Sequence, residues 1–225
     1  MASANEDKYN VIESTAAASR NATAIAEVCY EYFSANARFA SKTHDVLELA
    51  CGAGAHAVEV GAKCRDGTRS YRPSDVTSDA FEDIERAIAQ RVEEHGGNVR
   101  EPVVIDMATF EPESESLDGV VAVNAAHVAS ARAVDGMFRG SAKGLRSGGV
   151  LLIYGPFKDE DLVSRDGFRS DGDRAFDAAL RVRDAENFGL VSVQRMDAYA
   201  SAHGLAPVAR KEMPANNLTL VYSKP

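Results

Sequence analysis

The sequence predicts an α/β fold in which a mostly parallel sheet is covered by helices on both faces. Apolar runs of strand length alternate with segments of helical periodicity through most of the 225 residues, which is typical of parallel sheets with right-handed crossovers. The last two strand-like segments, 206–212 and 218–222, follow one another along the chain. They are expected to form a hairpin that adds an antiparallel C-terminal edge strand.

The first elements follow from simple patterns. Residues 1–14 are polar and are expected to be a flexible leader. Apolar side chains then recur at three- and four-residue steps, which predicts a helix over 16–39. The apolar run 45–49 is expected to be a buried strand, and the small residues after it lead into a helix over 53–63.

The next two strands are each expected to be closed by an acid. Residues 69–75 are interpreted as a short strand that ends in a turn, and 103–105 as a short apolar strand. Between them, Ser78 or Asp79 can cap a helix that runs to about Glu94.

The second half of the chain continues the alternation. An apolar strand over 117–123 precedes a helix over 131–145. Gly148 and Gly149 stop this helix before a strand over 150–154.

The last third contains one irregular stretch. The polar region 156–187 is expected to hold a helix near 174–182. A final helix is expected over 192–203, before the terminal hairpin.

Length and composition limit the possible classes of protein. A chain of 225 residues with 45% apolar residues predicts one globular domain, 1–225. Its formal net charge of −9 argues against broad nucleic-acid binding, which needs a basic face. No apolar run approaches the ~20 residues that span a bilayer, so no membrane partner is expected. Three cysteines without a C-x-x-C pair favour a reduced, cytoplasmic setting, and no metal site is expected.

The segment E-L-A-C-G-A-G-A-H at 48–56 is the most informative stretch. Gly52 and Gly54 permit a sharp turn and the close approach of a ligand. The spacing fits both the dinucleotide fingerprint and the first motif of S-adenosylmethionine (SAM) methyltransferases. A carboxylate at Glu48 would repel a pyrophosphate and attract the cationic groups of SAM, so charge favours SAM. A glycine turn without a ligand is the alternative.

Polar residues close the predicted strands, at the sheet edge where ligands of parallel sheets bind. Asp75 can accept hydrogen bonds from both ribose hydroxyls, and Asp106 from an adenine amino group beside the Met107 N–H and thioether. Asn124 is expected near the methionine part, and His127 is a candidate general base near neutral pH. The alternatives are ordinary turn acids and a structural histidine.

Several segments resemble the DUF938 (methyltransferase-like protein 26) family of SAM-dependent methyltransferase-like proteins. The segment at 48–56 is similar to the family's E-I-A-S-G-T-G-Q-H, although Ala53 and Ala55 replace two side-chain donors. The unusual segments A-F-D at 175–177 and M-P-A-N-N at 213–217 make the match specific. Further matches are R-N at 20–21, R-P-S-D at 72–75, N-A-A-H at 124–127 and Y-G-P-F at 154–157, so the resemblance covers nearly the whole chain.

The resemblance implies a seven-stranded class I SAM-methyltransferase fold of the Rossmann-like type, with SAM as cofactor and S-adenosylhomocysteine (SAH) as product. Together with the patterns above, it places the cofactor on Arg20, Glu48, Ala50, Gly52, Gly54, Asp75, Asp106, Met107 and Asn124. His127 and Tyr154 are the catalytic candidates, and Asp177, Asn216 and Asn217 are the substrate candidates.

The favoured function is a SAM-dependent methyltransferase that acts on a small-molecule acceptor by in-line transfer, in which placement of the nucleophile supplies most of the rate. Three alternatives stay open: a methyltransferase of protein or RNA, a non-catalytic SAM- or SAH-binding protein, and a nicotinamide enzyme. The accepting atom, the general base and the oligomeric state are not indicated by the sequence.

Overall fold

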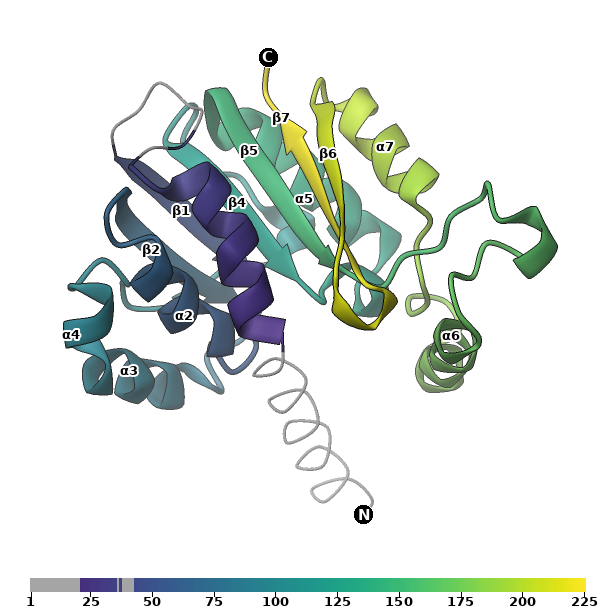
Figure 1. The fold of residues 1–225 in the computed structure, drawn as a ribbon, viewed down its shortest axis with the longest axis horizontal. Helices are drawn as coiled ribbons and strands as arrows, with labels where there is room; N and C mark the ends of the chain where they lie inside the picture. The colour runs from purple at the N-terminus through teal and green to yellow at the C-terminus, as the bar shows by residue number, and fades with distance from the viewer. Residues whose placement is uncertain (1–20, 36, 38–42) are drawn as a thin grey trace. The chain divides into compact units, whose positions relative to one another are not determined.

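The computed structural model describes residues 21–35, 37 and 43–225 of the chain. It divides into two compact units, Met1–Val104 and Ile105–Pro225, each with its own strands and helices (Figure 1). The expected leader and Arg20 lie outside the described residues.

The first unit contains three parallel strands in the order β3-β2-β1. These are β1 (His44–Leu49), β2 (Thr68–Asp75) and β3 (Val103–Val104), and Val46 of β1 pairs with Tyr71 of β2. Helical residues 21–33 precede β1. The remaining helices of this unit are α2 (Ala55–Lys63), α3 (Phe81–Gln90) and α4 (Val92–His95).

Apolar side chains from helices and strands form the core of the first unit. Ile25, Phe33, Leu49, Tyr71 and Ile84 are almost completely buried. This agrees with the sequence, because the buried positions of helix 21–33 recur at helical spacing and β1 is buried along nearly all of its length.

The cap predicted at Ser78 or Asp79 does not form, because α3 begins after Ala80 without a side-chain cap hydrogen bond. The predicted helix, which ends near residue 94, is also interrupted at Arg91. This residue has φ −114° and separates α3 from α4. Its guanidinium pairs with Glu59 of α2 and with Glu94, and the break holds it between these two carboxylates.

The second unit has four strands in the order β4-β5-β7-β6. β4 (Leu117–Val123) and β5 (Leu145–Gly155) are parallel, whereas β7 (Leu218–Ser223) is antiparallel to β5 and to β6 (Ala206–Glu212). β5 starts at Leu145, earlier than the predicted residue 150, because the pairing of β4 with β5 resumes across an irregularity between Leu117 and Gly119.

Three helices of the second unit begin with a serine at the N-cap, a position where serine is favoured. The hydroxyls of Ser130, Ser170 and Ser192 accept a backbone N–H three residues further on, at the starts of α5 (Ala131–Gly144), α6 (Asp171–Arg183) and α7 (Val193–Ala202). Between β5 and α7, the chain makes a long excursion that carries α6 (Figure 1). A small cluster of Phe168, Leu180 and Leu190 stabilises it.

Along the whole chain the strand order is β3-β2-β1-β4-β5-β7-β6. The predicted fold class, a seven-stranded, mostly parallel Rossmann-like sheet with helices, is therefore confirmed. One detail differs from the prediction: the antiparallel strand β7 lies between β5 and β6, so the C-terminal edge strand is β6.

Candidate functional site

The turn after β1 is built from left-handed residues. Ala50, Gly52 and Gly54 have φ of 53°, 55° and 70°, and α2 begins at the next residue. A Cβ on Gly54 would lie 2.8 Å from Cγ1 of Ile84, so helix packing as well as φ requires glycine there. A Cβ on Gly52 would meet nothing within 4 Å, which leaves open space for a ligand beside the backbone.

Asp75 ties the end of β2 to this turn. One carboxylate oxygen accepts a hydrogen bond from the Gly52 N–H at 2.7 Å, and the other accepts from the Val76 N–H at 2.7 Å. A carboxylate has about four acceptor positions, so Asp75, which is half-buried, keeps capacity for further donors such as ribose hydroxyls. The predicted cofactor role of Asp75 therefore fits the local geometry.

Glu48 lies under the turn with no exposed surface. Nδ1 of His56 lies 3.7 Å from a carboxyl oxygen of Glu48. Burial raises the pKa of Glu48 to about 8; the Tyr71 hydroxyl opposes this rise and the Asp75 charge adds to it. The carboxyl is therefore mostly protonated at pH 7, whereas the sequence argument assumed a negative charge. The cofactor role of Glu48 stays a prediction.

Asp106 and Met107 belong to the second unit. One oxygen of Asp106 accepts the Ala108 N–H at 2.8 Å and so caps the short 3-10 helix η1 (Met107–Thr109). Asp106 is exposed and Met107 half-exposed. Because η1 occupies only one carboxylate oxygen, Asp106 can still accept a hydrogen bond from a ligand amino group.

Asn124 and His127 converge on one point of β5. Asn124 has φ 55°, and its N–H donates to the Tyr154 carbonyl at 2.8 Å, at the ends of β4 and β5. A Cβ on Gly155 would lie 3.7 Å from Oδ1 of Asn124 and 3.7 Å from Nδ1 of His127. Both polar atoms therefore face the same glycine, which leaves room for a small group between them.

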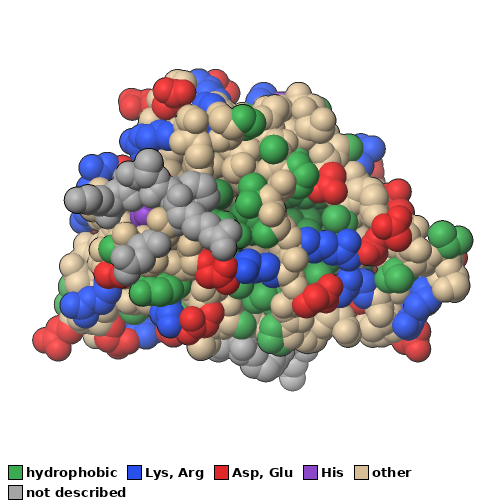
Figure 2. Space-filling model, turned by 45° about the horizontal axis from the view of Figure 1, so that its top comes forward, with side chains coloured by type: hydrophobic (Ala, Val, Ile, Leu, Met, Phe, Trp, Pro, Cys, Tyr) green, Lys and Arg blue, Asp and Glu red, His purple; other side chains and the backbone are tan. Residues whose placement is uncertain are grey.

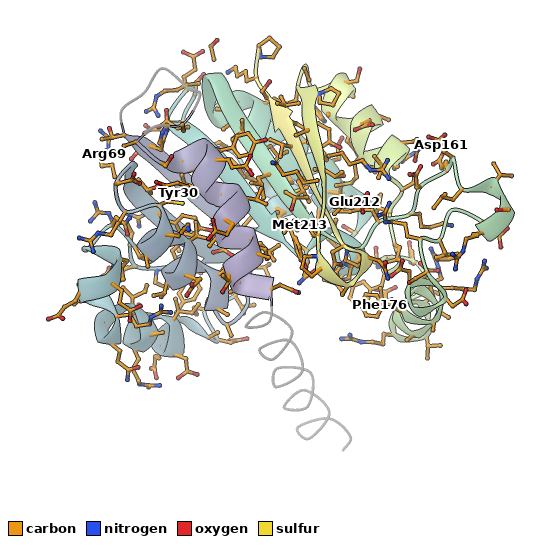
Figure 3. All side chains as sticks on the ribbon, viewed as in Figure 1. Tyr30, Arg69, Asp161, Phe176, Glu212 and Met213 are labelled. Atoms are coloured by element: carbon orange, nitrogen blue, oxygen red, sulfur yellow. The ribbon has the colours of Figure 1, made fainter. Side chains whose placement is uncertain are left out.

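His127 is buried and its ring meets an aromatic neighbour. The Phe176 ring of α6 (labelled in Figure 3) contacts it edge-on, with centroids 5.3 Å apart. Burial lowers the pKa of His127 to about 4. The imidazole is thus neutral at pH 7 and a weaker base than the sequence argument assumed, so the structure favours a hydrogen-bonding role over proton abstraction.

Tyr154 carries a buried hydroxyl without a hydrogen bond of normal geometry among the described residues. Burial raises its pKa to about 12, and the nearby Asn217 side chain opposes the rise. Ser141 and Thr219 also have buried hydroxyls of this kind, and the Tyr154 hydroxyl keeps the capacity to hydrogen-bond a ligand.

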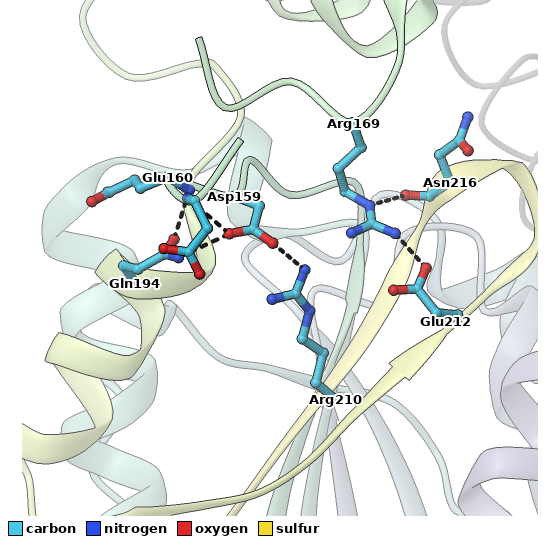
Figure 4. A network of polar contacts seen from close by, with 8 residues as sticks. Asp159, Glu160, Arg169, Gln194, Arg210, Glu212 and Asn216 are labelled. Atoms are coloured by element: carbon cyan, nitrogen blue, oxygen red, sulfur yellow. Dashed lines mark hydrogen bonds and ion pairs between the residues drawn. The ribbon is translucent and has the colours of Figure 1, made fainter. Parts of the chain in front are cut away.

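The turn between β6 and β7 presents Asn216 and Asn217. Ala215 and Asn216 are both left-handed, with φ of 59° and 60°. Arg169 holds this turn, since its guanidinium donates to the Asn216 carbonyl at 3.3 Å and pairs with Glu212 of β6 (Figure 4). Strained non-glycine residues of this kind persist only where the surroundings fix them, and they cluster at binding sites.

The Asp177 carboxylate is hydrogen-bonded to other residues of the second unit. Its carboxylate accepts hydrogen bonds from Nε of Arg181 at 2.9 Å and from the Leu190 N–H at 2.7 Å. Gly189 has φ 147°, and a Cβ there would lie 2.6 Å from the Arg181 guanidinium. Asp177 therefore fastens the segment before α7 to α6, which differs from the substrate contact that the sequence predicts.

The two units thus carry different parts of the predicted set. Glu48, Ala50, Gly52, Gly54 and Asp75 gather at the turn of the first unit. Within the second unit, Asn124 and His127 gather near Gly155, whereas the Tyr154 hydroxyl lies near the Asn217 side chain. Sequence reasoning missed Gly155, Phe176 and Arg169, although the first two lie in the Y-G-P-F and A-F-D segments.

No group of three or more His, Cys, Asp or Glu side chains in 21–35, 37 and 43–225 could hold a metal ion. No helix in that part of the chain is long and apolar enough to cross a membrane.

Residues 12–224 match the sequence profile of a family described as "Protein of unknown function (DUF938)". The fold matches an O-methyltransferase family protein from Burkholderia thailandensis with a TM-score of 0.73 at 18% identity, over 97% of this chain and 60% of that one. The fold also matches an O-methyltransferase family 2 protein from Planctomyces limnophilus in complex with apigenin. The TM-score is 0.72 at 17% identity, over 100% of this chain and 62% of that one.

A third solved structure is a geranyl diphosphate C-methyltransferase from Streptomyces coelicolor with Mg²⁺, geranyl diphosphate and SAH. Its TM-score is 0.67 at 12% identity, over 90% of this chain and 80% of that one. At such identities the likeness establishes the fold alone. The chain spans about 60% of the length of the two O-methyltransferase family proteins.

Proposed function

Because this chain belongs to the DUF938 family and has the class I methyltransferase fold, we propose that it binds SAM and transfers its methyl group to a small-molecule acceptor. The observation that carries the proposal is the bond from the Gly52 N–H to Asp75. It places a carboxylate with spare acceptor capacity beside a turn that has open space at Gly52.

In the first unit, Asp75 would accept hydrogen bonds from the ribose hydroxyls, while Ala50, Gly52 and Gly54 let the backbone approach the ligand. Glu48 would lose its proton when a cationic group arrives, because an opposite charge lowers a carboxyl pKa. SAM supplies an activated methyl group on a sulfonium, so the protein's main task is to place the nucleophile.

In the second unit, Asp106 and Met107 are proposed for the adenine ring. Asn124, His127 and Tyr154 would bind the acceptor through neutral hydrogen-bonding groups, and Asn216 and Asn217 would border it. Since His127 and Tyr154 both titrate far from pH 7, an acceptor would have to bring a nucleophile that needs little help from a base.

The second candidate function is a non-catalytic protein that binds SAM or SAH. It is supported by the pKa values of His127 and Tyr154, since neither side chain has the pKa of an effective general base at neutral pH. An RNA substrate is disfavoured by the net charge of −9, and acidic and basic side chains are interspersed on the face in Figure 2.

Incubation of the protein with methyl-labelled SAM and a small-molecule extract distinguishes the two candidates. Methyl transfer predicts label in a small molecule, and no such label with the Asp75→Ala variant. Binding of SAM to the wild-type chain without any transfer would favour the non-catalytic protein. Transfer to protein or RNA added to the same assay would replace the small-molecule acceptor with a macromolecule.

A further inference from the structure

A pocket of about 510 Å³ lies in the second unit, apart from Asn124 and Tyr154. Three stretches of chain line it: the residues after β5, the turn around Val163 and Gly167, and the approach to α7. The volume lies in the range of small-molecule sites.

Two cations line the pocket without carboxylate partners. Nζ of Lys158 lies 4.5 Å from the centroid of the Phe168 ring. The Arg195 guanidinium lies 5.0 Å from the centroid of the Tyr199 ring and donates to the Tyr199 hydroxyl. In the described part of the chain, neither cation has a carboxylate oxygen within ion-pair distance, so aromatic rings hold both.

Three other arginines around the excursion are paired with carboxylates. Arg169 binds Glu212, Arg174 binds Asp166, and Arg210 binds Asp159, which Gln194 also contacts (Figure 4). Lys158 and Arg195 differ from these three arginines, because aromatic rings rather than carboxylates contact them.

The two acids at the pocket are already engaged. Glu160 accepts a hydrogen bond from the Ser192 hydroxyl at 2.5 Å. Asp166 is paired with Arg174, which does not line the pocket, at 2.9 Å. Lys158 and Arg195 therefore outnumber the remaining acid, Glu160, by one charge.

The rest of the wall is suited to an apolar group and to negative charge. Leu190 and Val191 line one wall, and Val163 lines another and is 80% exposed. Ser192 caps α7, a ten-residue helix whose positive N-terminal end adds to the field of the two cations.

We propose that this pocket binds a small organic carboxylate, with its charged end on Lys158 and Arg195 and its apolar body against Leu190 and Val191. Arg195 suits a carboxylate because a guanidinium can donate two parallel hydrogen bonds to it. This site is independent of the proposed methyl transfer, since none of its residues belongs to the predicted cofactor or acceptor set.

The same stretch of chain connects the pocket to His127. The Lys158 N–H donates to the Val191 carbonyl, the Val193 N–H donates to the Lys158 carbonyl, and the Gly189 N–H donates to the His127 carbonyl. A carboxylate that orders residues 189–193 would therefore act on the backbone that contacts His127.

The test is a titration of the full-length ¹⁵N-labelled chain, without SAM, with phenylacetate. Three control ligands are titrated in the same way. Acetate carries the carboxylate without the apolar ring, and 2-phenylethanol carries the ring without the charge. Inorganic phosphate tests a different anion. Saturable binding of phenylacetate, with amide shifts confined to residues 158–167, residues 189–195 and the His127 backbone that Gly189 contacts, is the expected result. Equal or tighter binding of 2-phenylethanol, or of phosphate, would overturn the assignment, as would the absence of phenylacetate binding.

Variants locate the binding. Lys158→Gln and Arg195→Gln should each weaken phenylacetate at least about tenfold, because each removes a charge-assisted hydrogen bond. Glu160→Gln should tighten it, because Gln can still accept from Ser192 without a charge. Lys143→Gln, at a lysine paired with Glu111 elsewhere in the same unit, should change nothing. Unchanged affinity in folded Lys158→Gln and Arg195→Gln would contradict the proposal.

Discussion

The Asp75 carboxylate accepts the Gly52 N–H at 2.7 Å, and this bond joins the end of β2 to the glycine turn after β1. One side chain therefore both shapes the turn and offers acceptor positions beside it. The account of this protein as a SAM-binding chain depends on that relationship.

Asp75→Ala should abolish the stabilisation by SAM. The variant loses both the acceptor for ribose hydroxyls and the bond that holds the Gly52 backbone. The measurement is the melting temperature with and without SAM. The control is Asp79→Ala, an exposed acid in the turn that follows β2, which should keep the full SAM effect. If Asp75→Ala keeps it too, Asp75 does not belong to the site.

Gly54→Ala should lower the free energy of unfolding by about 2–4 kcal/mol, because a left-handed alanine is strained and its Cβ would lie 2.8 Å from Ile84. Gly96→Ala is the matched control. Gly96 has φ 64° and open space around its missing Cβ, so only the strain of about 1–2 kcal/mol applies. Equal losses in urea denaturation would mean that the contact with Ile84 has no effect.

Glu48→Gln should remove a pH dependence of stability. The folded pKa of about 8 lies above the ordinary carboxyl value of 4.5, so the folded chain holds a proton that the unfolded chain releases between those values. The contribution of Glu48 is therefore present below pH 4.5 and is lost as pH rises towards 8, by about 1.4 kcal/mol per unit.

The measurement is the difference in unfolding free energy between Glu48→Gln and wild type at pH 5, 6, 7 and 8. This difference should shift in favour of the glutamine variant as pH rises. A flat difference for Glu48→Gln would show that the carboxyl is ionised in the folded chain throughout.

Tyr154→Phe and Tyr222→Phe should have opposite effects. The Tyr154 hydroxyl lacks a normal hydrogen bond within the described residues, so its removal should leave stability within about 1 kcal/mol and reduce methyl transfer. The Tyr222 hydroxyl donates to Asp197 at 2.8 Å, so its removal should cost about 1 kcal/mol and leave transfer intact. Full transfer by Tyr154→Phe would remove Tyr154 from the acceptor site.

Most of the fold could be predicted because local patterns and tertiary structure agree. The apolar run of β4 and the glycine turn after β1 are both recognisable in the sequence, whereas the cap predicted at Ser78 or Asp79 does not form. The break at Arg91 and the early start of β5 could not be predicted, since one depends on carboxylates from another helix and the other on the pairing register with β4.

The residues of the candidate site could be proposed from the sequence, but their protonation states and contacts could not. The strand-end position of Asp75 favours a ligand role, but its bond to the Gly52 N–H is not visible in the sequence. The protonation of Glu48 and His127 depends on burial in the folded chain, and for Glu48 also on the Tyr71 hydroxyl, which is distant in sequence. The bond of Asp177 to the Leu190 N–H likewise joins residues that no local pattern connects.

The most direct test of the central claim is a thermal shift of the wild-type chain with SAM, SAH, NAD and NADP in parallel. A ligand at 100 times its dissociation constant stabilises the folded chain by about 2.7 kcal/mol, which is several degrees for a domain of this size. The account predicts that SAM and SAH raise the melting temperature and that NAD and NADP do not. A shift with NAD or NADP and none with SAM or SAH would contradict it.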